Sequence, residues 1–576
     1  MEKDRQKKRI KPAVLVLILA AAVAVVGVLV FLFERYTPSK SRMDRNEYFG
    51  LSGEDTAGIA AEELAVVTNG EISEYRAIRD GEAVYLDYRA VSSSVNRRIW
   101  YDEEEEVLVL ARPDELTVID AGDGADASLV KRIGDDLYLS RDFLDTCTDW
   151  TCTEVSDPAR LVIFTRWSYA AEDAADQAYV RYRAGIKSPV LRELAAGETV
   201  RVRDISSDGT PSADKVDGWT YVTTKDGFTG YVQDKYLKNL RKVEEEHEPV
   251  WGTYTSISMD EPVNMAFHQV TNRAANASLE KMLSGTKGLN VIAPTWFFLN
   301  DREGNLTSLA TEDYVAAAHE AGLSVWAVVN DFDGSVHSAE DTAAALSSFR
   351  AREMMVSVIM EEAERTGFDG VNVDFEKVTE DAAPAFLEFV RELSSACRAR
   401  GLVLSVDNYV PEFTKYLDRR EQGIVADYVV TMCYDEHTAG SAEAGSVASL
   451  PYVKKGIEDT LLEVPAEKVI AAIPFFTRFW VTRGSGAPSS SALGMEEADR
   501  TIDDYRLSER WDEETGQNYA AFSDGDTKYE IWLEDRDSVA AKMQAVAESG
   551  VAGVAEWKLG LEKKEIWDVI ASRLAG

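Results

Sequence analysis

The chain of 576 residues has few cysteines and histidines, and it has fewer positively charged than negatively charged side chains. It contains 4 cysteines and 5 histidines, and no group of them has the spacing of a metal-binding motif, so we expect neither a metal nor another cofactor. Lysine and arginine number 62 against 101 aspartates and glutamates, which gives a formal net charge of −39. A nucleic acid needs a cationic partner surface, so the composition argues against nucleic-acid binding.

The scarcity of cysteine also limits disulfide chemistry. Cys147 and Cys152 are close enough in the sequence for a small-loop disulfide outside the cell, and the sequence leaves open whether they form one. Cys397 and Cys433 lie in apolar patterns that are typical of a helix and a strand.

Charged and strongly polar side chains are missing altogether from residues 13–33. A helix of this length crosses the hydrocarbon core of a bilayer, so we predict a transmembrane helix. The tail before it, residues 1–12, carries six lysines and arginines against Glu2 and Asp4. By the positive-inside rule this tail is cytoplasmic, and the body of a single-pass protein then lies outside the cell membrane. The alternative is a cleaved signal peptide, for which the alanines at residues 20–22 offer a cleavage site.

After a linker at residues 34–67, short β-type runs alternate with turn residues over residues 68–169, which predicts a small β-rich module. The sequence Leu-Tyr-Leu-Ser-Arg-Asp-Phe-Leu at residues 137–144 resembles the N-terminal domain of copper amine oxidases, a module that serves as a stalk in secreted bacterial proteins. The resemblance implies a stalk without a copper site.

A second β module is predicted for residues 178–241, where four β-type runs are separated by turns. Its glycines and aromatic residues, with a closing Gly-Tyr-Val at residues 230–232, resemble a bacterial Src-homology-3-like domain. That resemblance implies either binding to the cell wall or a spacer role. Trp219, Tyr221 and Tyr231 are accordingly either ligand contacts or core residues.

The largest part, residues 248–576, alternates strand-like runs with amphipathic helical patterns, which predicts a parallel sheet of βα units. Eight such runs predict an α/β fold, a (β/α)8 TIM barrel, preceded by the two β-rich modules and the transmembrane helix. Residues 484–535 exceed what a barrel needs, and we expect a small α+β insertion there. The predicted strands are residues 263–270, 289–294, 324–329, 370–376, 402–408, 428–434, 469–475 and 551–557.

The fourth predicted strand ends in Asn372-Val-Asp374-Phe-Glu376, where polar and apolar side chains alternate. Alternate side chains of a strand share a face, so Asn372, Asp374 and Glu376 are expected to point the same way. Carboxylates are costly to bury, and the active sites of TIM barrels lie at the carboxyl ends of the strands. We therefore expect an acid/base site at this strand end.

These residues and two later segments resemble glycoside hydrolase family 18, the chitinase family. The resemblance covers about residues 250–576 and implies a retaining, substrate-assisted mechanism in which the 2-acetamido oxygen of the sugar is the nucleophile. The segments that carry it are Asp369-Gly-Val-Asn372-Val-Asp374-Phe-Glu376, similar to the family's Asp-x-x-Asp-x-Asp-x-Glu signature, Met432-Cys-Tyr434-Asp435, similar to its sixth-strand motif, and Trp557 on the eighth strand.

The resemblance implies distinct roles for these side chains. Glu376 would be the general acid and base, Asp374 would orient and stabilise the acetamido group, and Tyr434 would donate a hydrogen bond to that group. Asn372 departs from the pattern, because many chitinases have an aspartate there. An amide can form a hydrogen bond with Asp374 but cannot share a proton with it.

Other residues near the predicted strand ends are candidates for substrate binding. Trp557 is expected to form the floor below the sugar ring, with Trp296 and Trp480 as walls. A buried tryptophan in a barrel is commonly a core residue, and this alternative stays open for all three. The remaining candidates for sugar contact are Asn372, Asp435, Asn330 and Arg478.

The expected position outside the membrane narrows the substrate. An anchored enzyme in the cell wall meets peptidoglycan continuously, so we expect a glycoside hydrolase, an N-acetylglucosaminidase, that cleaves β-1,4 bonds of this polysaccharide. Residues 434–437, 448–451 and 532–538 also resemble the spore-cortex-lytic branch of the family. The alternatives are a chitinase or chito-oligosaccharide hydrolase, and a non-catalytic glycan-binding barrel, against which the presence of Glu376 argues.

Overall fold

The computed structural model describes residues 12–51, 62–203, 210–336 and 338–574. Its contacts divide the chain into two compact units, Met1–Arg97 with Ala121–Trp251, and Arg98–Asp120 with Gly252–Gly576. The basic tail predicted for residues 1–12 lies outside the described residues except for Pro12.

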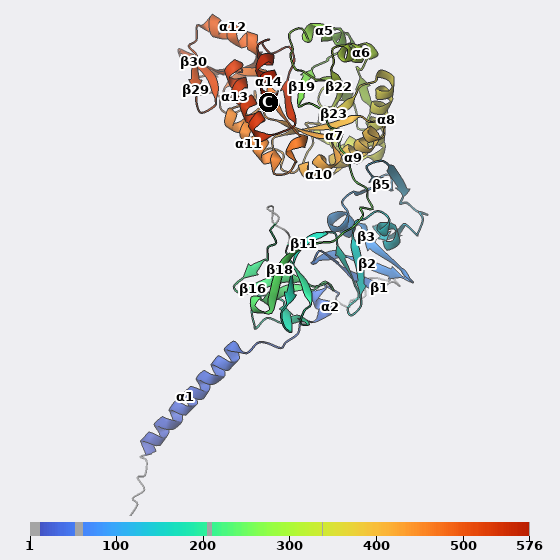
Figure 1. Ribbon diagram of the computed structural model, residues 1–576, viewed down its shortest axis with the longest axis vertical. Helices are drawn as coiled ribbons and strands as arrows, with labels where there is room; N and C mark the ends of the chain where they lie inside the picture. Colours follow the sequence, from blue (N-terminus) through green and yellow to red (C-terminus); the bar gives the residue numbers. More distant parts are fainter. Residues whose placement is uncertain (1–11, 52–61, 204–209, 337, 575–576) are drawn as a thin grey trace, which may run out of the picture. The chain divides into compact units, whose positions relative to one another are not determined.

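The apolar segment near the N-terminus forms one helix, α1 (Pro12–Tyr36), which is labelled in Figure 1. The stretch Val16–Tyr36 has a mean hydropathy of 3.2, and none of it is buried in the protein. At 1.5 Å per residue this stretch is about 30 Å long, which matches the hydrocarbon core of a bilayer. By length and composition the helix can therefore cross a membrane. The short helix α2 (Arg45–Tyr48) follows it.

Seven strands of the first unit form one sheet, in the order β7-β8-β3-β2-β1-β10-β9. Strands β1 and β10 run parallel and the other neighbours antiparallel. Its elements are β1 (Glu62–Thr68), β2 (Glu71–Asp80), β3 (Ala83–Asp87), α3 (Tyr88–Ala90), the π-helix Val91–Val95, β7 (Val130–Ile133), β8 (Asp136–Ser140), α4 (Arg141–Asp145), β9 (Thr151–Val155) and β10 (Arg160–Phe164).

A second sheet of this unit has the order β13-β12-β17-β16-β14-β11-β18, with β15 paired to β16. Of the aromatic residues singled out in the sequence, Trp219 is buried, whereas Tyr221 is 36% exposed and packs edge-on against Tyr231 with ring centroids 5.1 Å apart. The strands are β11 (Ser168–Ala174), β12 (Ala178–Arg181), β13 (Val190–Leu194), β14 (Thr199–Arg203), β15 (Lys215–Val216), β16 (Trp219–Thr223), β17 (Thr229–Gln233) and β18 (Leu237–Glu244), with a 3-10 turn at Asp234–Tyr236.

The second unit contains a closed parallel barrel, in the order β19-β32-β26-β25-β24-β23-β22-β20, with β20 paired back to β19. All eight predicted strands are present, so the predicted (β/α)8 fold is confirmed. The short β21 (Leu306–Ser308) adds an antiparallel edge to β20. The barrel strands are β19 (Val263–His268), β20 (Val291–Leu299), β22 (Ser324–Asn330), β23 (Gly370–Asp374), β24 (Val403–Tyr409), β25 (Tyr428–Met432), β26 (Val469–Pro474) and β32 (Gly553–Trp557).

Helices surround these strands (Figure 1). Residues at the helix ends stop each helix so that the chain can return to the next barrel strand. Helix α8 begins where the hydroxyl of Ser348 accepts a hydrogen bond from the N–H of Ala351, and it ends at Gly367, whose φ of 77° suits a glycine. Strand β23 follows three residues later. The helices are α5 (Leu279–Met282), α6 (Glu312–Glu320), α7 (Ala339–Ser347), α8 (Phe349–Thr366), α9 (Ala383–Arg398), α10 (Arg419–Val425), α11 (Leu450–Leu461), α13 (Arg536–Ser549) and α14 (Ile566–Leu574), with 3-10 turns at Arg273–Ser278 and Ala466–Lys468.

An additional antiparallel sheet lies between β26 and α13, in the order β28-β27-β31-β30-β29. It begins at Phe476, ahead of the insertion expected at residues 484–535. The buried Glu534, just after this sheet, accepts two hydrogen bonds of 2.6 Å from the ammonium of Lys542 in α13. The elements are β27 (Phe476–Arg483), β28 (Ser489–Gly494), α12 (Met495–Tyr505), β29 (Arg510–Asp512), β30 (Gln517–Asp524) and β31 (Thr527–Trp532).

A three-stranded sheet, β4 (Ile99–Asp102), β5 (Val107–Ala111) and β6 (Leu116–Asp120), belongs by its contacts to the barrel unit, although it lies inside the span 68–169 predicted as a β-rich module. Asp102 accepts a hydrogen bond of 2.6 Å from the N–H of Phe349. Arg98, just before β4, forms an ion pair of 2.7 Å with Glu421 of α10. These polar contacts join the small sheet to the helices of the barrel.

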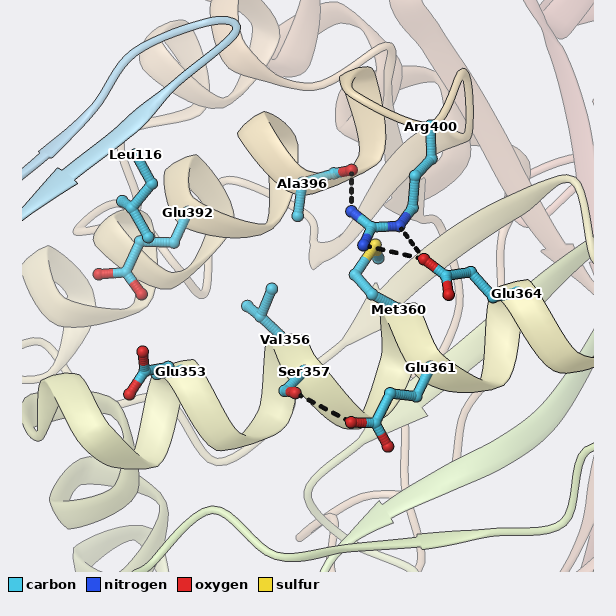
Figure 2. A pocket seen from close by; sticks show the side chains of 10 residues that line it. All are labelled: Leu116, Glu353, Val356, Ser357, Met360, Glu361, Glu364, Glu392, Ala396 and Arg400. Carbon is cyan, nitrogen blue, oxygen red and sulfur yellow. Dashed lines mark hydrogen bonds and ion pairs between the residues drawn. The ribbon is translucent and has the colours of Figure 1, made fainter.

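Residues of β6, α8 and α9 line a pocket of about 390 Å³, drawn in Figure 2. Leu116 and Val356 supply apolar lining, while the polar lining consists mainly of four glutamates and Arg400. Arg400 is paired with one of them, Glu364, at 3.2 Å. Because α8 and α9 belong to the outer ring of helices, this pocket is separate from the carboxyl ends of the barrel strands.

Candidate active site

Strand β23 carries two of the predicted site residues, Asn372 and Asp374, which are 0% and 3% exposed. Asp374 ends the strand and Glu376 lies two residues beyond it. The alternation of side chains along the strand therefore does not by itself determine the direction in which the side chain of Glu376 points. The strand begins at Gly370. A Cβ at this position would lie 2.8 Å from the ring of Trp326 and 2.9 Å from the carbonyl oxygen of Val403. Glycine therefore lets β23 approach both neighbouring strands closely.

The backbone that carries Glu376 is held by Asp331, the residue after β22. Its carboxylate accepts hydrogen bonds from the N–H of Glu376 at 2.9 Å and the N–H of Lys377 at 3.0 Å. The hydroxyl of Thr342 donates to the same carboxylate at 3.0 Å. Asp331 is not among the site residues predicted from the sequence, although an aspartate directly after a predicted barrel strand is a usable signal.

Tyr409, the last residue of β24, reaches the carboxyl of Glu376. Its hydroxyl donates a hydrogen bond of 2.5 Å to Oε2 of Glu376. Tyr409 is likewise absent from the predicted site residues. The polar residues Ser405, Asp407 and Tyr409 alternate along this strand, which is the same signal that identified the fourth strand.

The surroundings of Glu376 favour its protonated form. Its side chain is exposed at the mouth of the site, while the protein atoms around its carboxyl hinder ionisation and raise its pKa. The hydrogen bond from Tyr409 opposes this rise, and the charges of Asp331, Asp435 and Asp333 add to it. A carboxyl whose pKa is raised toward neutrality can act as a general acid.

Burial raises the pKa of Asp374 well above its usual range, and the carboxylates of Asp407 and Glu376 raise it further. Asp407, on β24, is also buried, and burial raises its pKa above the usual range. Neither carboxyl has an ion pair with a lysine or arginine among the described residues. The site therefore gathers several carboxyls that cannot all be ionised at once.

Tyr434 lies two residues after β25 and is buried beside the carboxyls. Burial raises its pKa well above the usual range, and the charges of Asp374 and Asp407 act in the same direction. The phenol therefore stays protonated at neutral pH and can donate a hydrogen bond. Its ring packs edge-on against Phe476, with ring centroids 6.4 Å apart.

Asp435, the residue after Tyr434, lies within the electrostatic influence of Arg478. Asp435 is half-buried and has a φ of 61°, a conformation that departs from the strand alternation. Burial raises its pKa and the positive charge of Arg478 lowers it. Arg478, on β27, also donates a hydrogen bond of 3.2 Å to the hydroxyl of Ser490. The additional sheet therefore places a positive charge near the end of β25.

Trp557 is the last residue of β32 and remains partly exposed, as a sugar platform requires. Its ring packs against Phe267 of β19, with centroids 5.4 Å apart. The partial exposure leaves an aromatic surface at the carboxyl end of the barrel.

Two predicted aromatic walls are core residues instead. Trp296 is fully buried, its indole N–H donates a hydrogen bond of 3.0 Å to Asn276, and its ring packs against Tyr314. Trp480 is also fully buried, and its N–H donates to the carbonyl of Gly445 at 2.9 Å. Neither ring exposes surface to a ligand, so the prediction of walls was wrong for both.

The two predicted asparagines also have structural roles. Asn330 is 0% exposed, and its side-chain oxygen accepts hydrogen bonds from the N–H groups of Phe332 and Asp333, which forms the turn after β22. Asn372 is 0% exposed below Asp374 and binds side chains of β24. Direct sugar contact was therefore a wrong prediction for both residues.

The thiols and metal-ligand candidates do not add to this site. All four cysteines are free thiols, so the structure contains no Cys147–Cys152 disulfide. Within the described ranges, no group of three or more histidine, cysteine, aspartate or glutamate side chains could hold a metal ion.

Comparison with protein families finds two matches in the chain. Residues 334–562 match the model described as Glycosyl hydrolases family 18, and residues 176–238 match Bacterial SH3 domain. The first match spans β23, β24, β25, β26 and β32. The second agrees with the Src-homology-3-like module predicted from the sequence.

Two curated Bacillus subtilis proteins and one solved structure are similar to the chain. "Putative sporulation-specific glycosylase YdhD" is 29% identical over 41% of this chain, which spans 57% of that relative's length. The "Cortical fragment-lytic enzyme" is 23% identical over 48% of this chain and 66% of its own. The crystal structure of a chitinase from Chromobacterium violaceum covers 55% of this chain and 99% of its own, with 23% identity and a TM-score of 0.49.

The family match falls on the barrel and includes the strand ends that carry Asp374, Glu376, Tyr434 and Trp557. The barrel of this chain is therefore a glycosyl hydrolase family 18 domain.

Proposed function

We propose that the barrel hydrolyses β-1,4 bonds that follow N-acetylhexosamine units, most of all in peptidoglycan, by a retaining, substrate-assisted mechanism. The observation that carries this proposal is the convergence of Asp374, Glu376 and Tyr434 at the carboxyl ends of the barrel strands. Their raised pKa values fit an acid, a charge-stabilising carboxyl and a hydrogen-bond donor.

Glu376 is the general acid of the first step. Its carboxyl proton passes to the glycosidic oxygen while the 2-acetamido oxygen of the sugar attacks the anomeric carbon, and the bond between that carbon and the leaving oxygen breaks. The resulting oxazolinium ion is then opened by water, whose proton Glu376 accepts. Two displacements at the same carbon retain its configuration.

Asp374 and Tyr434 act on the acetamido group. The carboxylate of Asp374 accepts the acetamido N–H and balances the positive charge that develops on the ring, while the phenol of Tyr434 donates to the acetamido oxygen. Trp557 supports the sugar from below. Asp331 and Tyr409 are positioning residues, because they act through the backbone and the carboxyl of Glu376.

The helix and the domain that precede the barrel, together with the names of two relatives, favour peptidoglycan as the substrate. Helix α1 can hold the chain at a membrane, either as an anchor or as a signal segment, and both place the barrel outside the cytoplasm. The SH3 domain is of the bacterial type, which supports contact with the cell wall. The names of two relatives concern sporulation and cortical fragments, both linked to spore walls.

Digestion of purified material tests the proposal. The full-length protein in detergent micelles is incubated with vegetative peptidoglycan, spore cortex or chitin, and the products are identified by mass spectrometry. We expect new reducing-end N-acetylglucosamine from wall material. The Glu376→Gln variant, which has no acidic proton, should lose at least about a hundredfold in rate.

The matched control is Glu380→Gln, the same substitution at an exposed residue of the following loop, which should retain full activity. Products from chitin but not from wall material would show that the substrate is chitin and not peptidoglycan. Full activity of Glu376→Gln would refute the mechanism, and no product from any of the three polymers would refute the hydrolase itself.

A further inference from the structure

The hydrogen bonds of Asn372 leave Asp374 without a donor. The amide nitrogen of Asn372 uses both of its hydrogens on β24, one toward the hydroxyl of Ser405 at 2.9 Å and one toward Oδ1 of Asp407 at 2.6 Å. The pairing of β23 with β24, with Asn372 opposite Ser405, fixes this arrangement, and the same register continued to the ends of both strands sets Asp374 beside Asp407. No hydrogen therefore remains on Asn372 for its neighbour on the same strand.

Three buried acceptor atoms remain in this cluster. They are Oδ1 of Asn372, Oδ1 of Asp374 and Oδ2 of Asp407, and no donor among the described residues reaches any of them. A buried acceptor without a donor is costly, and a buried second charge costs more. One proton placed on either carboxyl turns an acceptor into a donor and removes one charge.

The surrounding groups also favour a bound proton. The charge of Asp407 is the strongest electrostatic influence on Asp374, and burial outweighs it. The groups that face the cluster from the neighbouring elements are acidic: Asp331 and Asp333 after β22, Glu376 after β23, and Tyr434 and Asp435 after β25. The nearby cations act elsewhere, Lys377 and Lys558 on Asp331 and Asp333 and Arg478 on Asp435.

We propose that Asp407 is a positioning residue that shares a single proton with Asp374, so that the two carboxyls of neighbouring strands act as one singly charged pair. Asp407 thereby supplies from β24 the carboxyl that Asn372 lacks on β23. This inference rests on the proposed function for its role in catalysis, while the shared proton itself does not depend on it.

The negative charge of the Asp374–Asp407 pair can shift toward the acetamido group when that group becomes positively charged. In the free site the proton and the charge are distributed over both carboxyls. When the acetamido group becomes a cation, the O–H bond at Asp374 breaks and one forms at Asp407, so the negative charge gathers on Asp374 beside the cation. No proton enters or leaves the pair, and no other reactant is needed.

Infrared difference spectroscopy of the full-length protein in micelles at pH 7 tests the shared proton without any substrate. The wild-type pair contributes one carboxylic-acid C=O band. We expect Asp407→Asn and Asp374→Asn each to abolish that band, because the new amide donates to the remaining carboxylate. Asp407→Leu should keep it, because Asp374 alone in apolar surroundings binds a proton.

The double variant Asn372→Asp/Asp407→Asn moves the second carboxyl onto β23 and should restore the band, which also controls for misfolding of the single variants. Circular dichroism verifies the fold of each variant. Persistence of the band in either single amide variant would show that the proton belongs to one carboxyl alone and would overturn the proposal.

Kinetics supply the second readout. At pH 7, kcat of Asp407→Leu should fall at least about tenfold with KM little changed, and the ratio of its kcat to that of the wild type at the same pH should recover by up to about tenfold per pH unit as Asp374 ionises. A loss in Asp407→Leu that does not recover with pH would indicate packing alone and contradict the proposal. If the wild type cleaves no polymer, the proposed function fails and the infrared result still decides the shared proton.

Discussion

Replacing Tyr409 with phenylalanine removes the hydrogen bond of 2.5 Å that its hydroxyl donates to Glu376, with little change in shape. A hydrogen bond to an ionised group contributes about 1.5–3 kcal/mol. Because Glu376 is exposed, water replaces part of this bond, and we expect a contribution just below that range, about 1.4 kcal/mol. This free energy corresponds to about one pKa unit.

The direction of the change follows from which form the bond stabilises. Tyr409 donates to the carboxylate, so its removal favours the protonated form and raises the pKa of Glu376. The alkaline limb of the kcat/KM profile reports the general acid of the free enzyme. That limb should therefore move to higher pH by about one unit in Tyr409→Phe.

The assay measures kcat/KM between mildly acidic and alkaline pH with a fluorogenic glycoside of an N-acetylglucosamine dimer. Tyr416→Phe is the matched control, because the hydroxyl of Tyr416 donates to the carbonyl of Val378 and not to Glu376. Its alkaline limb should coincide with that of the wild type. An unchanged or lowered limb in Tyr409→Phe would refute the assigned role of this hydrogen bond.

Two further predictions concern stability, measured by guanidinium unfolding at pH 7. Lys542→Met breaks the buried ion pair with Glu534 and should lower the unfolding free energy of the barrel unit by about 3–5 kcal/mol, whereas Lys528→Met, which removes the exposed lysine of the pair with Glu530, should cost less than about 1 kcal/mol. Equal losses in the two variants would contradict this. Gly553→Ala places a Cβ 2.0 Å from the carbonyl oxygen of Val263 and should cost about 3 kcal/mol or prevent folding, whereas Gly440→Ala meets open space and should change the free energy by less than about 0.5 kcal/mol. A loss below about 1 kcal/mol in Gly553→Ala would show that β19 and β32 can separate to admit a methyl group.

Local patterns were sufficient for the architecture of the barrel. Each strand is a short apolar run between amphipathic helical segments, and burial on both faces of a parallel sheet produces such runs. The same alternation identified Asp374 and Glu376 before any partner was known. The resemblance of the first β-rich module to the copper amine oxidase domain stays a prediction.

These patterns did not reveal how deeply a side chain is buried or which residues it contacts. Trp296 follows a predicted strand just as Trp557 ends one, yet the first is fully buried and the second partly exposed. Alternation states which face a side chain occupies but not how many layers cover that face. Asn330 was misassigned for the same reason, because a turn closes over its amide.

The sequence by itself determined the apolar helix at the N-terminus, the eight-stranded barrel and the strand that carries Asp374 and Glu376, because periodicity and charge act over a few neighbouring residues. Only the tertiary structure decided that Asp331, Asp407 and Tyr409 complete the site. These three are 33 to 45 residues away in the chain from the residues that they bind. The register between neighbouring parallel strands, which no single strand encodes, brings them within hydrogen-bonding distance.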